Sequence, residues 1–143
     1  IQLSLPRMEA NMEISISTEN GRVPVAVMHL TGDLDSKTAP SFQSKADELI
    51  TNGTKYILVD LTHVRFISSA GLRALHEIFK RLRSFSPDVS EQEMLRQINE
   101  GTYKSPAIKL LKPSKEAQVS MKTAGFDMFL ESHQDLNKAV ASF

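Results

Sequence analysis

The sequence of 143 residues contains no cysteine. Disulfide bonds, cysteine nucleophiles and zinc sites with cysteine ligands are therefore excluded, and the absence is consistent with a reducing compartment. No run of 18 apolar residues occurs, so we expect no membrane-inserted segment. Residues 1–7 lack both the basic and the apolar region of a signal peptide. Together these absences predict a cytoplasmic protein.

The chain also has no excess of charge, because 17 basic side chains balance 17 acidic ones. A nucleic-acid-binding surface needs a basic face, so the composition argues against nucleic acid as a partner. Hydrophobic residues make up 41% of the chain, which is typical of a folded globular protein. At this length we expect one domain with one core.

The common catalytic and cofactor motifs are absent as well. The sequence contains neither the glycine-rich dinucleotide fingerprint nor the P-loop pattern, and no two of its four histidines are four residues apart. Ser68-Ser69-Ala70-Gly71 lacks the first glycine of the hydrolase nucleophile elbow. We therefore predict no metal, no cofactor and no enzymatic activity.

Hydrophobic periodicity predicts a mixed α/β protein. Alternation over residues 12–18, a turn at Asn20-Gly21 and a second run over 23–31 predict a hairpin. Short apolar runs predict further strands over 56–59, with Asp60 at the carboxyl end, 107–111 and 128–130. Helical spacing and caps predict helices over 39–51, from Ser68 to about residue 83, over 90–100, over 115–123 and after Ser132. After the hairpin, strands alternate with helices, which predicts a mostly parallel sheet of four to five strands with helices packed on it.

One strand–helix junction suits an anion. Ser68 and Ser69 lie at the start of the second helix, where free N–H groups and the helix dipole favour negative charge. A phosphate on Ser69 would be stabilised there and would place about −1.5 to −2 charges on the surface. On these residues alone a purely structural role is favoured, since serine is a good N-cap and Gly71 permits close packing.

Three segments resemble one known family. Residues 30–35, followed by Thr38-Ala39, are similar to a Leu-Thr-Gly-Glu-Leu-Asp…Thr-Ala segment of the STAS-domain anti-sigma factor antagonists. Residues 60–72 resemble the signature of that family, and residues 107–143 resemble its closing strand–helix–strand–helix. The resemblance implies a STAS (SpoIIAA-like) fold over residues 12–143, preceded by an arm of residues 1–11.

The resemblance further implies a function and a site. The domain would bind an anti-sigma factor that is itself a serine kinase, and phosphorylation of Ser69 would release that partner and regulate transcription. A phosphatase would complete the cycle. The residues implied in partner binding lie in two loops and the second helix: Asp33, Asp35, Ser68, Ser69, Ala70, Gly71, Leu72 and Arg73.

Two departures from the family pattern leave alternatives open. Ser68 stands where the family has an acid, so Ser68 is a competing phosphoacceptor. Residues 85–105 are an expected insertion that carries a capped short helix, either a solvated insert or an additional partner surface. The alternatives for function are a STAS interaction domain without phosphorylation and a small-molecule-binding module. The former would be a scaffold in a stress-signalling complex, a lipid-transport subunit or the tail of an anion transporter.

Overall fold

The computed structural model of the protein describes residues 12–143, so the expected arm of residues 1–11 lies outside the described part. In chain order the elements are β1 Glu13–Asn20, β2 Pro24–Thr31, α1 Ala39–Thr51, β3 Ile57–His63, α2 Ser69–Phe85, α3 Glu91–Glu100, β4 Ile108–Leu111, α4 Lys115–Thr123, the 3₁₀ helix η1 Phe126–Met128, β5 Glu131–His133 and α5 Leu136–Ala141. Within residues 12–143, no helix is long and apolar enough to cross a membrane.

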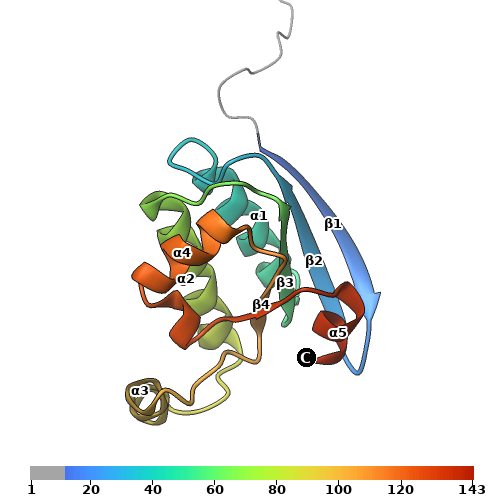
Figure 1. The fold of residues 1–143 in the computed structure, drawn as a ribbon. Helices are drawn as coiled ribbons and strands as arrows, with labels where there is room; N and C mark the ends of the chain where they lie inside the picture. Colours follow the sequence, from blue (N-terminus) through green and yellow to red (C-terminus); the bar gives the residue numbers. More distant parts are fainter. Residues whose placement is uncertain (1–11) are drawn as a thin grey trace, which may run out of the picture.

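The five strands form one sheet in the order β1-β2-β3-β4-β5, with β1 antiparallel to β2 and the other pairings parallel. Each crossover moves one strand further in the same direction. Because such crossovers are right-handed, their helices α1, α2 and α4 must cover the same face of the sheet. Figure 1 shows these three helices together on one side of the strands. The predicted α/β class and mostly parallel sheet are confirmed.

The main core lies between the sheet and these helices. Alternate side chains of β2 and β3, such as Met28 and Val59, are buried there against side chains of α1 and α2, such as Phe42 and Leu75. All four are 0% exposed. The other face carries a smaller core, in which Ala139 and Val140 of α5 pack on β2, β3 and β4. Since α5 has only 6 residues, it leaves β1 and the carboxyl-terminal parts of β2 and β3 on this face to polar side chains, including His29.

Two of the predicted boundaries are wrong. Asp60 does not end the third strand, because β3 continues to His63 with a register shift against β2. The strand predicted over residues 128–130 does not form. Gly125 adopts a left-handed φ of 82° after α4, and the N–H of Leu130 donates to the Phe126 carbonyl at 2.9 Å. Phe126, Phe129 and Leu130 therefore pack on the core, whereas Met128 remains 43% exposed. The short edge strand β5 follows them.

The cap predicted for the last helix is also wrong. The Asp135 carboxylate, and not Ser132, accepts the N–H of Lys138 at 2.8 Å at the start of α5. The cap predicted for the inserted helix is confirmed, since Ser90 Oγ accepts the N–H of Glu93 at 3.1 Å. Met94 and Ile98 of α3 pack against the main core, while Leu95 remains 52% exposed.

Candidate docking site at the start of helix α2

The two serines at the start of α2 have different environments. Ser68 is the N-cap, and its Oγ accepts the N–H of Gly71 at 3.4 Å, as expected for serine at this position. Ser68 is half-buried, whereas Ser69 begins the helix and is exposed. Ser69 thus presents its hydroxyl to solvent at the positive end of a helix of 17 residues.

The loop after β2 joins the loop before α2 through Leu34. The N–H of Leu34 donates to the Phe66 carbonyl, and the N–H of Ser68 donates to the Leu34 carbonyl, both at 2.9 Å. Leu34 and Ile67 form an isolated parallel bridge. Two of the segments that carried the family resemblance, residues 30–35 and 60–72, are therefore hydrogen-bonded to each other.

Gly71 allows α2 to approach this junction. A Cβ at position 71 would lie 2.6 Å from the Leu34 carbonyl oxygen and 3.0 Å from the Ile67 side chain. Such distances are shorter than van der Waals contact, so the packing requires glycine. The structural role anticipated for Gly71 is present, and its use in partner binding stays a prediction.

The two acidic residues of the first motif hold the loop conformation. Asp33 pairs with Arg65 at 3.0 Å, and this pair raises the pKa of Arg65. The Asp35 carboxylate accepts the N–H groups of Lys37 and Thr38 at 2.9 and 3.3 Å. Asp35 therefore closes the turn that precedes α1.

Ser114 connects the start of α4 to the same loops. Its Oγ donates to the Arg65 carbonyl at 2.8 Å and accepts the N–H of Ala117 at 3.0 Å. Ser114→Ala is expected to reduce the free energy of unfolding by about 1 kcal/mol, as for other lost N-caps. Urea denaturation checks this, with Ser120→Ala on the same helix as control. An equal loss in both variants would contradict a specific role for Ser114.

Two grooves flank the exposed ridge of α2. One, of about 350 Å³, lies between α1 and α2 and is lined by Ser36, Ala70 and Arg73 among others. The other, of about 430 Å³, lies between α2 and the η1 segment and is lined by Ser69, Leu72 and Arg73 together with aromatic side chains. Each predicted partner-binding residue of α2 except Gly71 thus lines one of the two grooves, and Arg73 lines both.

Sequence reasoning missed the aromatic wall of the second groove. Phe126 and Phe129 lie 5.1 Å apart between ring centroids, and His76 is within 6.3 Å of both. His76 is exposed on α2, and its aromatic neighbours come from a segment about 50 residues later. The predicted strand over residues 128–130 did not indicate this wall, because the wall depends on the 3₁₀ helix η1 that forms there instead.

A hydrogen-bonded chain across three strands was also missed. His29 contacts Ser17 through Nε2 at 2.8 Å and Asp60 through Nδ1 at 2.7 Å. The order resembles that of a nucleophile, a base and an orienting acid, but none of the three residues lines either groove. The chain cross-links β1, β2 and β3 on the sheet face that α5 leaves uncovered.

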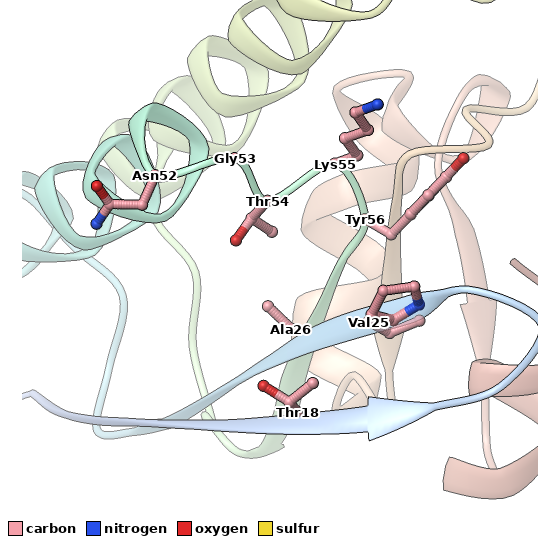
Figure 2. Close-up of a pocket in the computed structure, with 9 residues that line it drawn as sticks. Thr18, Val25, Ala26, Asn52, Gly53, Thr54, Lys55 and Tyr56 are labelled. Carbon is pink, nitrogen blue, oxygen red and sulfur yellow. The ribbon is translucent and has the colours of Figure 1, made fainter.

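A third hollow, of about 450 Å³, lies at the amino end of β3, whereas Ser69 follows the carboxyl end of that strand. Figure 2 shows that the Lys55 and Tyr56 side chains do not converge with Thr54 and Thr18 on one point. Among residues 12–143, no group of three or more His, Cys, Asp or Glu side chains could hold a metal ion. Ligands of open α/β sheets bind at the carboxyl ends of the strands, whereas this hollow lies where β3 begins.

Comparisons with known proteins agree with this geometry. Residues 16–86 match the family model of the STAS domain. An anti-sigma factor antagonist of Mycobacterium paratuberculosis has a TM-score of 0.68 at 17% identity, with 98% of this chain and 97% of that one covered. A Thermotoga maritima protein described as an anti-sigma factor antagonist has a TM-score of 0.66 at 16% identity over 88% and 90%.

The Bacillus anti-sigma factor antagonist SpoIIAA in its unphosphorylated form has a TM-score of 0.58 at 15% identity, covering 89% of this chain and 93% of that one. No curated protein sequence matches the chain significantly. At these identities the structures show the fold, which is SpoIIAA-like. The matched STAS-domain model over residues 16–86 and the SpoIIAA-like α/β fold of the chain therefore agree.

Proposed function

We propose that the protein is an anti-sigma factor antagonist that binds an anti-sigma factor kinase and is switched by phosphorylation of Ser69. The observation that carries this proposal is the exposed Ser69 hydroxyl at the tip of α2, between two grooves that a partner can enter. The proposed role is binding and not catalysis. Structural relatives with the same fold are described as anti-sigma factor antagonists, which supports this choice.

The geometry favours Ser69 over Ser68 as the phosphoacceptor. The Ser68 hydroxyl caps α2 and is half-buried, so a kinase would have to break the cap to reach it. Ser69 needs no such rearrangement. A phosphate on Ser69 would lie beside the free N–H groups at the helix start, which favour an anion.

Phosphorylation would change the electrostatics of the docking surface without refolding it. About −1.5 to −2 charges would appear on a surface that contains the cationic Arg73, one helical turn from Ser69. A partner that fits the neutral surface would then meet repulsion and a bulky group. Release of the partner follows from this local change.

The test is incubation with ATP and the cognate anti-sigma factor kinase, followed by intact mass measurement and peptide mapping. We expect one phosphate on the wild-type protein, one on Ser68→Ala and none on Ser69→Ala. Phosphorylation should weaken partner binding by about tenfold or more, which corresponds to about 1.4 kcal/mol. A phosphate on Ser68 alone would refute the assignment to Ser69.

A second candidate function is a STAS interaction domain that is not phosphorylated. The family's acid is replaced by Ser68, which removes one carboxylate next to the acceptor and favours this candidate. It predicts that a matched partner binds but transfers no phosphate to either serine. The same experiment therefore separates the two functions.

A further inference from the structure

The groove between α2 and η1 has one wall made by a regular helical stripe. Ser69, Leu72, Arg73 and His76 lie at positions i, i+3, i+4 and i+7, which places them on one face of α2. Ser69 is at the amino end of this stripe. A molecule bound along the groove would therefore also lie next to the Ser69 hydroxyl.

The opposite wall is apolar and aromatic. Phe126 and Phe129 approach the His76 ring edge-on, with centroids 6.3 and 6.1 Å away. Phe129 is also in contact with the buried Phe79, at 4.9 Å between centroids. Ala124 lies at the mouth and is exposed. Edges of packed aromatic rings form a rigid surface on which an apolar side chain can be buried.

The charge on the groove has one sign. Arg73 and His76 are the two lining residues that can carry charge, and both are basic. Within residues 12–143, the Arg73 side chain has neither an ion pair nor a hydrogen bond, in contrast to Arg65, Arg83 and Arg96. An exposed cation without a partner beside an apolar wall is complementary to an acidic group next to an apolar one.

We propose that this groove receives a segment of the anti-sigma factor that presents an apolar side chain next to a carboxylate. The inference rests on the proposed function and deepens it, since it assigns Phe126, Phe129, His76 and Arg73 to the partner interface. The apolar side chain lies against the two phenylalanines. The carboxylate pairs with Arg73.

The same arrangement connects binding to the switch. Arg73 is four residues after Ser69 on the same helical face, within reach of a phosphate on that residue. The phosphate would compete with the partner's carboxylate for Arg73 and repel it. Phosphorylation thus acts on the contact that the groove provides.

The experiment measures the affinity of the full chain for its anti-sigma factor by titration calorimetry. Ala124→Trp fills the groove from an exposed position, and Arg73→Glu reverses its charge. The matched controls are Val119→Trp, at a 65% exposed position of α4 outside the groove, and Lys138→Glu on α5, across the sheet. Thermal unfolding of every variant establishes that it is folded.

We expect about tenfold weaker binding or more for both groove variants and less than about twofold change for both controls. Arg73→Glu should also reduce the dependence of binding on salt, and phosphorylation should then have a smaller effect. If wild type binds and all four variants bind equally, the groove is not the interface and the proposed function stands. If wild type binds no anti-sigma factor, the proposed function fails and this inference fails with it.

Discussion

Gly71→Val is expected to lower the free energy of unfolding by about 3 kcal/mol, the upper part of the range for overpacked sites. For a chain of this size the melting temperature should fall by about 10 °C. The reason is local, because the new Cβ would lie 2.6 Å from a backbone oxygen of Leu34 and 2.8 Å from its Cγ. Neither atom can move freely, since Leu34 is 0% exposed and its N–H and C=O groups are both hydrogen-bonded.

Gly71→Ala should have the same sign and a smaller size, because alanine gains about 1 kcal/mol of helix propensity over glycine. Arg73→Val is the matched control, two residues later at an exposed position of the same helix. Thermal denaturation followed by circular dichroism measures all three. If Gly71→Val melts within about 2 °C of the control, less than 1 kcal/mol by the same scale, the close approach of α2 to Leu34 does not constrain the fold.

The effect matters for the proposed docking surface as well as for stability. Leu34 and Gly71 hold the loop that carries Asp35 and the start of α2 that carries Ser69 at a fixed separation. A larger side chain at position 71 would displace one loop from the other. Partner binding should therefore fall in Gly71→Ala even where most molecules remain folded.

Much of the fold was predictable because its signals are local. The period of the helix over Ala39–Thr51 and the capping serines Ser68 and Ser90 each act within a few residues. Each therefore appears in the sequence and in the structure at the same place. The parallel sheet then follows from the alternation of strands and helices.

The C-terminal errors arose where tertiary packing outweighs local propensity. Phe129 and Leu130 have the residue types of a strand, but they contact the main core after the chain reverses at Gly125. The actual edge strand, Glu131–His133, is polar and carries no hydrophobic period. The position of Ser69 at the start of α2 was predictable from its motif. The aromatic wall beside it was not, because it depends on the reversal at Gly125.

The chain Ser17–His29–Asp60 was not predictable, because its members come from three strands and no motif connects them. Asp60 is the centre of the cluster. Its side chain is 13% exposed and accepts a hydrogen bond from His29 Nδ1. It also accepts the backbone N–H of Thr62 at 3.0 Å and the Thr62 hydroxyl. A replacement of Asp60 without acceptors would leave the His29 donor without its protein partner and would release the two exposed Thr62 donors to water.

Asp60→Ala is accordingly expected to lower the free energy of unfolding by about 2–3 kcal/mol at pH 7, the range for a hydrogen bond to a charged group. Burial by itself would raise the pKa of Asp60, but hydrogen bonds from Thr62 and His29 and the charge of His29 together hold it below the usual 3.8. A carboxylate with a lowered folded-state pKa stabilises the protein above its unfolded-state value, and this contribution is lost as the pH falls through the folded-state value. The difference between wild type and Asp60→Ala should therefore be largest at neutral pH and decrease below about pH 4.

Urea denaturation from pH 7 to pH 3 measures this difference in the free energy of unfolding, with Asp127→Ala at an exposed position as control. A difference that stays constant over this range would show that the Asp60 carboxylate does not stabilise the three strands through its charge.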